Sequence, residues 1–245
     1  MKPHIIPAFV LFYACYIAAL HGHAQDEPDV DKQLWIQASF NWRLNEKWTF
    51  NQDISYQHIY TSPFTTRFFV RPQFNRQITG AFSLHGGAMF FYNFKKENNN
   101  SIELRPWLGA KLNWLSFWRL DFSHYLRLEQ RFEHTNGIAD WKNGFRIRYR
   151  IGSDLPINHV SLTDHTLYGI LSYEFYAVPF ESSGSGKFAF ETTNRFDLGL
   201  GYWQHIDRRY EIVLVAFEQP GEDQGKFSIN NLVLFLKYKK YFNWE

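Results

Sequence analysis

Side chains alternate between apolar and polar along most of this chain, with a period of two residues. In the stretch SHYLRLEQRF, residues 123–132, Leu126 and Leu128 share one parity, whereas Arg127 and Glu129 share the other. Successive side chains of a β-strand point to opposite faces, so this pattern predicts a strand with one apolar and one charged face. The fold then depends on which of the two faces is buried, and against what.

The alternation recurs in eleven segments along the chain. It is clear in residues 34–44, 68–78, 102–114, 118–132, 141–151 and 195–202, and weaker in 48–60, 82–94, 167–177, 210–217 and 229–238. Many of these segments are 10 to 15 residues long. Strands of soluble proteins average about five or six residues, whereas tilted strands that cross a membrane need about 9 to 11. The segment lengths therefore favour membrane-spanning strands.

Composition argues against a disordered chain, a helical membrane protein and a nucleic-acid-binding protein. Hydrophobic residues make up 45% of the chain and aromatic residues 20%, which is enough for one substantial folded domain. Beyond the N-terminal region no apolar run reaches the roughly 18 residues of a membrane-spanning helix. The formal net charge is only +2, so the charge balance gives no reason to expect a nucleic-acid partner.

The first 24 residues have the pattern of a secretory signal peptide. Lys2 precedes an apolar run from Ile5 to Leu20, and small residues lead up to Ala24. We expect cleavage after Ala24, so that the mature chain begins at Gln25. An uncleaved anchor is the alternative, but the apolar run is shorter than the roughly 20 residues that span a bilayer. Cys15, the only cysteine, lies in this region, so the mature chain has no disulfide and no thiolate site.

Short and long connections alternate between the predicted strands. Residues 45–46, 79–80 and 115–117 form tight connections, whereas residues 61–65, 95–101 and 133–140 are longer and polar. Membrane barrels have short periplasmic turns and longer outer loops. Aromatic pairs such as Trp42 and Trp48 bracket the tight turns, as an aromatic girdle at a membrane interface would.

These features predict an all-β fold with two segments, a signal peptide in residues 1–24 and a barrel domain in residues 25–245. We expect a transmembrane, antiparallel, up-and-down β-barrel of about 10 to 12 strands in the outer membrane. The alternative is a soluble secreted β-barrel or sandwich, in which the apolar faces turn inward and the charged faces meet water. The load of Leu, Phe, Trp and Tyr on the strands favours the membrane barrel.

Three features depart from a regular barrel. Bacterial barrels usually have an even number of strands, so eleven segments imply an undetected strand before Leu34. Pro72 and Pro106 lie within predicted strands, where proline removes a donor from the hydrogen-bond ladder, and we expect bulges there. Residues 152–166 are long where a short turn is expected, and we interpret them as a periplasmic excursion.

In a membrane barrel the charged parity faces the lumen. Barrels of about eight strands are filled by side chains, whereas 16 or more strands leave a wide channel. At an intermediate size we expect a lattice of long, paired Arg and Glu side chains to occlude much of the lumen. The candidate lumenal residues are Arg67, Arg71, Glu103, Arg105, Arg119, Asp121, Arg127, Glu129, Arg131, Arg146, Arg148, Arg150, Glu174, Arg195 and Asp197. Arg-rich walls favour small anionic solutes, and the alternative is a lattice that only fills and stiffens the barrel.

Catalytic and metal sites have weaker support in the sequence. Ser83 and His85 share one face of a strand, as a serine nucleophile and its base would, but lumenal polar side chains fit the same pattern. His159, Asp164 and His165 lie near one another in the chain without the tight spacing of a metal site. We therefore expect no catalytic residues, no metal and no cofactor.

Four segments carry a resemblance to a known family. They are HYLRLEQRF, GFRIRYRIG in residues 144–152, SYEFY in residues 172–176 and NRFDLGLGY in residues 194–202. Together they resemble the outer-membrane barrel family known as domain of unknown function 2490. The resemblance implies a Gram-negative outer membrane and a barrel, but no established activity. Barrels of this kind often end on an aromatic residue that the assembly machinery reads, whereas here Glu245 follows Trp244.

The sequence thus predicts a non-enzymatic outer-membrane barrel that acts as a narrow pore, a binding barrel or a structural component. Its expected partners are outer-membrane lipids, the barrel assembly machinery during insertion, and a small anionic solute. A lipid-modifying enzyme of the lipase, acyltransferase or deacylase type and a soluble secreted barrel are the alternatives.

Overall fold

The computed structural model describes residues 30–61, 65–95, 100–181, 191–220 and 227–243. The chain divides into two units, Met1–Val30 and Asp31–Glu245, and the second unit holds all the described strands. The predicted signal peptide, residues 1–24, lies outside the described residues. Among the described residues, no helix has the length and apolar character needed to cross a membrane.

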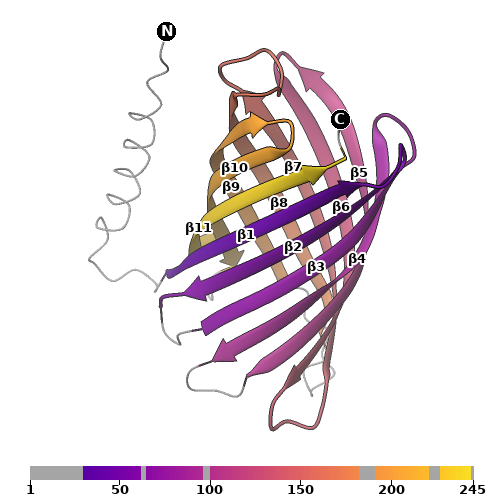
Figure 1. Ribbon diagram of the computed structural model, residues 1–245. Coiled ribbons are helices and arrows are strands. Elements are labelled where there is room, and N and C mark those ends of the chain that lie inside the picture. Colours follow the sequence, from indigo (N-terminus) through magenta and orange to yellow (C-terminus); the bar gives the residue numbers. More distant parts are fainter. Residues whose placement is uncertain (1–29, 62–64, 96–99, 182–190, 221–226, 244–245) are drawn as a thin grey trace. The chain divides into compact units, whose positions relative to one another are not determined.

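The second unit consists of eleven β-strands, coloured in chain order in Figure 1. They are β1 (Asp31–Arg43), β2 (Trp48–Ile59), β3 (Thr65–Gln77), β4 (Phe82–Lys95), β5 (Ser101–Phe117), β6 (Leu120–Thr135), β7 (Lys142–Pro156), β8 (Thr166–Glu181), β9 (Glu191–His205), β10 (Arg208–Pro220) and β11 (Phe227–Phe242). The shortest has 12 residues and the longest 17. The all-β class and the eleven strands of the sequence prediction are confirmed.

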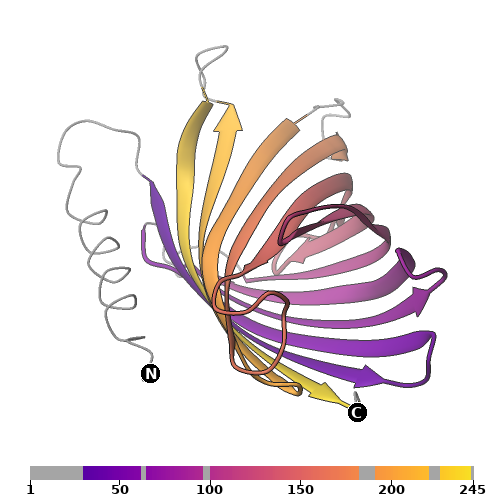
Figure 2. The same ribbon diagram turned by 90° about the horizontal axis from the view of Figure 1, so that it is seen from above.

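The strands close into one barrel, which Figure 2 shows from above. Each strand pairs antiparallel with its neighbour in sequence, and β1 pairs with β11 in parallel, from Asp31 opposite Asn231 to Trp42 opposite Phe242. The expectations of a wholly antiparallel sheet and of an extra strand before Leu34 are therefore wrong. In an up-and-down order an odd number of strands leaves the first and the last running in the same direction, so only a parallel pair can close the ladder.

The two ends of the barrel differ in their connections. The connections in residues 44–47, 78–81, 118–119 and 206–207 share one end, which we call the tight-turn end. Residues 157–165 connect β7 to β8 at the same end. This connection is shorter than the excursion predicted for residues 152–166, because β7 continues as strand to Pro156. Asn158 fixes its base, since its side chain donates to the His165 carbonyl (2.9 Å) and accepts from the Leu167 N–H (2.8 Å).

The apolar parity faces outward and the charged parity faces inward. Leu108 and Leu171 on the outer wall are 70% and 61% exposed, whereas the Glu129 side chain on the inner wall has no exposed surface. Apolar side chains on the outer face and buried charges on the inner face reverse the arrangement of a soluble barrel. The outer face of SHYLRLEQRF is therefore its leucine face.

Pro72 and Pro106 do not lie at bulges, so that expectation is wrong. The register between β3 and β4 is the same before and after Pro72, with Val70 opposite Phe90 and Gln73 opposite Gly87. The register between β5 and β6 likewise continues across Pro106. Each proline interrupts the ladder toward one neighbour only, because Pro72 pairs with Gln52 of β2 and Pro106 with Ala88 of β4. The ladder thus tolerates the missing donor without an inserted residue.

Gly201 provides the space for a large inward side chain. It lies opposite Tyr168 in the pairing of β8 with β9, and Tyr168 is completely buried. A Cβ atom at position 201 would lie 2.2 Å from the Tyr168 ring, whereas a Cβ atom at Gly80 would meet nothing within 4 Å. Gly201 is thus required for Tyr168 to lie flat against the inner wall.

We predict that Gly201→Ala destabilises the folded barrel by about 1–3 kcal/mol, the usual cost of forcing an extra methyl group into a packed site. Gly80→Ala is the matched control and should leave stability unchanged. Urea unfolding of the refolded protein, followed by tryptophan fluorescence, measures both. Equal stability of the two variants would contradict this account of Gly201.

Candidate functional site

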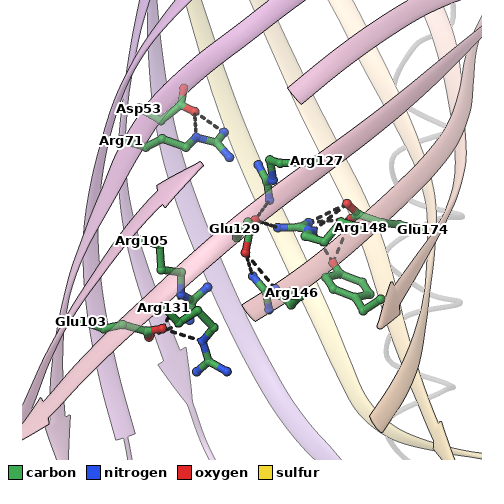
Figure 3. A network of polar contacts seen from close by, with 11 residues as sticks. Asp53, Arg71, Glu103, Arg105, Arg127, Glu129, Arg131, Arg146, Arg148 and Glu174 are labelled. Carbon is green, nitrogen blue, oxygen red and sulfur yellow. Dashed lines mark hydrogen bonds and ion pairs between the residues drawn. The ribbon is translucent and has the colours of Figure 1, made fainter. Parts of the chain in front are cut away.

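Glu129 on β6 lies at the centre of the inward charges (Figure 3). Its carboxylate forms ion pairs with Arg127 (2.6 Å) and Arg148 (3.1 Å), and it accepts a hydrogen bond from Arg146 Nε (2.8 Å). Arg127 precedes Glu129 by two residues on the same face, and Arg146 lies directly opposite on β7. Strand register alone therefore brings three guanidinium groups to one buried carboxylate.

Arg148 connects this group to the next strand. Its Nε and Nη2 atoms donate to the two carboxylate oxygens of Glu174 on β8, at 2.9 and 2.7 Å, while its Nη1 atom reaches Glu129. The Tyr176 hydroxyl donates to Glu174 at 2.8 Å. A guanidinium group can donate in several directions at once, so one arginine joins two carboxylates that do not touch.

Three further carboxylates on the inner wall are paired in the same way. Arg105 Nη2 and Arg131 Nε both donate to Glu103 at 2.7 Å, and Arg71 Nε donates to Asp53 at 2.8 Å. Asp197 accepts from Arg195 Nε at 2.7 Å and from the Ser172 hydroxyl at 3.0 Å, and it lies 3.4 Å from Arg150. We call these ion pairs, together with those of Glu129 and Glu174, the lumenal lattice.

Aromatic rings on the inner wall support the arginines. The Arg105 guanidinium lies 4.2 Å from the Phe91 ring centroid, and the Arg127 guanidinium lies 5.3 Å from that of Trp107. A ring face attracts a cation and presents a flat apolar surface against the guanidinium plane. These contacts restrict where each guanidinium can lie, and so they reinforce the ion pairs of the lattice.

The inner wall also holds two apolar clusters that the sequence analysis did not predict. Phe69, Met89, Phe91 and Trp107 form one, and Tyr168, Ile170, Val213, Val215, Val233 and Phe235 form the other. The second was missed because β10 and β11 have apolar residues on both parities, and the first because apolar residues such as Phe68 and Phe69 are adjacent on β3, so the alternation does not identify the inward face. Part of the lumen is therefore filled by apolar side chains.

Glu211 on β10 forms a further charged group that the sequence analysis missed. It accepts a hydrogen bond from the Tyr168 hydroxyl (2.8 Å), lies 3.5 Å from Lys237 Nζ and also binds Lys239. The repeated charges of Lys237 and Lys239, spaced by two residues, are the sequence signal that identifies this inward face.

The structure brings most of the candidate lumenal residues together. Arg71, Glu103, Arg105, Arg127, Glu129, Arg131, Arg146, Arg148, Arg150, Glu174, Arg195 and Asp197 all take part in ion pairs of the lattice. Arg67 lies at the edge of the lattice. Its Nε atom donates to Asn93 (2.6 Å), and its guanidinium lies 5.6 Å from the Phe91 ring centroid.

Arg119 and Asp121 lie outside the lattice, contrary to the prediction. Arg119 lies in the turn between β5 and β6, with its guanidinium over the exposed Trp118 ring, and Asp121 is exposed one residue into β6. Parity alone placed them inside the barrel. At the strand ends, however, water covers the side chains, so a charged side chain there needs no ion-pair partner.

The other candidate pairs of the sequence analysis have ordinary polar surroundings. The Ser83 hydroxyl lies 2.8 Å from His85 Nε2, and among the described residues no carboxylate contacts His85. His165 Nδ1 lies 3.2 Å from the Tyr202 hydroxyl, and Asp164 lies 3.9 Å from His205. In the part of the chain that the structure describes, no group of three His, Cys, Asp or Glu side chains is placed to hold a metal ion.

We predict that Glu129→Gln destabilises the barrel by about 3–5 kcal/mol, because it leaves the Arg127 and Arg146 guanidinium groups without their counter-charge and removes one of the two carboxylates that Arg148 binds. Glu46→Gln, at an exposed position in the turn between β1 and β2, is the control and should change stability by less than about 0.5 kcal/mol. The free energy of unfolding in urea measures both variants. A Glu129→Gln barrel as stable as the Glu46→Gln barrel would show that the lattice contributes little.

Comparison with known proteins identifies a family. No curated protein and no solved structure matches the chain. One family model, described as protein of unknown function (DUF2490), matches residues 32–212, from the start of β1 into β10. This match includes all of the lumenal lattice, and it confirms the resemblance seen in the four sequence segments. The chain belongs to the DUF2490 family.

Proposed function

We propose that this protein is a non-enzymatic β-barrel of the bacterial outer membrane, with a lumen that binds small anions and does not form an open pore. The observation that carries the proposal is the reversal of its two faces. Large apolar side chains cover the outside, whereas charged side chains are buried and paired inside. A wall of this kind is stable in lipid, where apolar side chains lose nothing by facing outward.

Strand length and aromatic placement support the membrane location. Strands of 12 to 17 residues suffice to cross the apolar part of a bilayer when tilted. At the tight-turn end, Trp114, Phe117 and Trp118 are 63%, 71% and 77% exposed. Exposed rings near the strand ends match the aromatic girdle by which membrane barrels meet the lipid headgroups.

The lattice supports a binding or structural role over an open pore. Glu129 is fully buried, and the arginines around it extend inward from β6 and β7 toward one another. A solute passing this level would have to separate several buried ion pairs, which is costly. The cations on the inner wall outnumber the carboxylates, so any small solute that enters is favoured when it is an anion.

We predict that Leu108→Arg, on the outer wall in the middle of β5, destabilises the barrel in lipid vesicles by about 2–4 kcal/mol. Leu44→Arg is the control, because Leu44 is similarly exposed but lies in a turn, and it should cost little. Urea titration in vesicles measures both. In cells, the wild type should fractionate with the outer membrane and migrate differently on gels with and without boiling. Recovery as a soluble protein, or an equal cost of the two substitutions, would reject the membrane location.

A lipid-modifying enzyme is the second candidate, and one observation favours it. The Ser83 hydroxyl lies within hydrogen-bond distance of His85 Nε2, as a nucleophile and its general base would. Ser83 is only 8% exposed, however, and both side chains point into the lumen, away from membrane lipid.

We expect lipid A and phospholipid profiles of a deletion strain to be unchanged after complementation with either the wild type or Ser83→Ala. Mass spectrometry of extracted lipids measures them. An altered profile that the wild type restores and Ser83→Ala does not would establish the enzyme.

A further inference from the structure

A second group of charges lies in the tight-turn half of the lumen, apart from Glu129. It comprises Lys111 on β5, Asp154 on β7, Arg209 on β10 and Lys239 on β11. Asp154 interacts electrostatically with Lys239 and Arg209, and Lys111 with Asp154 and Lys239. In strand order β5 and β11 lie on opposite sides of the barrel, so these side chains approach one another across the lumen.

Two of the described cations in this half of the lumen have no carboxylate partner. Among the described residues, Lys111 and Arg209 form no ion pair, and Asp154 has no cation within 4.0 Å. Lys239 shares the carboxylate of Glu211 with Lys237. The inward cations here are Lys111, Arg150, Arg209, Lys237 and Lys239, whereas the inward carboxylates are Asp154, Glu211 and Asp197, which also pairs with Arg195. The positive charge is therefore in clear excess.

Among the described residues, Arg209 is held in place by aromatic rings and not by an ion pair. Its guanidinium lies between two rings, 3.3 Å from the Trp203 centroid and 4.8 Å from the Tyr241 centroid. The Arg209 Nε and Trp203 Nε1 atoms are both buried donors with no hydrogen-bond partner in the described part of the chain. Ring contacts fix the position of a cation without neutralising it. Two buried donors and a cation without an ion pair thus lie side by side on the inner wall, among the residues that the structure describes.

An oxyanion satisfies these groups better than another protein side chain could. Half-buried cations without an ion-pair partner, such as Lys111 and Arg209, are costly in a confined lumen, and a bound anion reduces that cost. A tetrahedral oxyanion accepts hydrogen bonds in several directions, and guanidinium and ammonium groups are its usual partners in proteins. Hydroxyl donors are also close, because Ser83 and Tyr125 are the direct register neighbours of Lys111 on β4 and β6.

We propose that Lys111, Arg209 and Lys239 form a binding site for a small, soluble, multiply charged oxyanion of the phosphate type. The proposal rests on the proposed function only in requiring that solutes reach the lumen from the tight-turn end. Asp154 neutralises part of the positive charge, so the site takes a compact anion and not an extended polyanion.

The test is calorimetric titration of the detergent-folded barrel with inorganic phosphate, at constant ionic strength set with chloride. The wild type should bind phosphate, and Lys111→Gln and Arg209→Gln should each weaken binding at least tenfold. Lys47→Gln, in the exposed turn between β1 and β2, is the control and should bind as the wild type does. No saturable binding by the wild type, or equal binding by Lys111→Gln, would overturn the site.

Folding of the variants is checked independently. Lys111 has no ion pair to lose, so without phosphate Lys111→Gln should unfold at the wild-type temperature or above it. Arg209→Lys keeps the charge but not the guanidinium plane, and it should bind phosphate with intermediate affinity.

A separate titration with short-chain phosphatidic acid distinguishes a lipid headgroup from a soluble anion. Binding of that lipid with no binding of inorganic phosphate would overturn the proposal. Fractionation of the protein as soluble would reject the membrane location, while phosphate binding could still be measured, so the two failures are distinguishable.

Discussion

Closure of the sheet by the parallel pair of β1 and β11 is the constraint on which the rest of this structure depends. Once the ladder is closed, no strand edge remains, and every strand must place alternate side chains inside. With eleven strands the interior is narrow enough for Lys111 and Lys239, from opposite walls, to interact electrostatically. Most charged side chains that enter such a space therefore form ion pairs there.

Arginine is suited to this space because of its shape. Arg148 reaches Glu129 with one nitrogen and Glu174 with two others, which an ammonium group on a flexible chain could not do with the same geometry. The lattice around Glu129 accordingly consists of arginines. Lysines occur in the tight-turn half, where Lys237 and Lys239 act as point charges around the single carboxylate of Glu211. The two halves of the lumen therefore differ in chemistry as well as in charge.

The alternation of side chains was sufficient to predict the strands, their number and the outward apolar face, because a period of two follows directly from strand geometry. It predicted a barrel but not the way in which the barrel closes, since the parallel pairing of β1 with β11 depends on the whole sheet. It also failed where both parities are apolar, as at Val213 and Val215, which are completely buried inside. Arg119 and Asp121 show a second limit of the method. Parity identifies the face on which a side chain lies, but it does not show how far along the barrel the side chain lies or whether it is buried.

The distribution of partners along the lumen bears on what the barrel can do. In the lattice, arginines hold the carboxylates of Glu103, Glu129 and Glu174 directly, so a solute would gain little there and would have to break existing pairs. In the tight-turn half, Lys111 and Arg209 have no ion pair to break among the residues that the structure describes. An anion can therefore bind on one side of the lattice at low cost but can cross it only at high cost. This asymmetry favours a barrel that holds an anion at one end over one that conducts it.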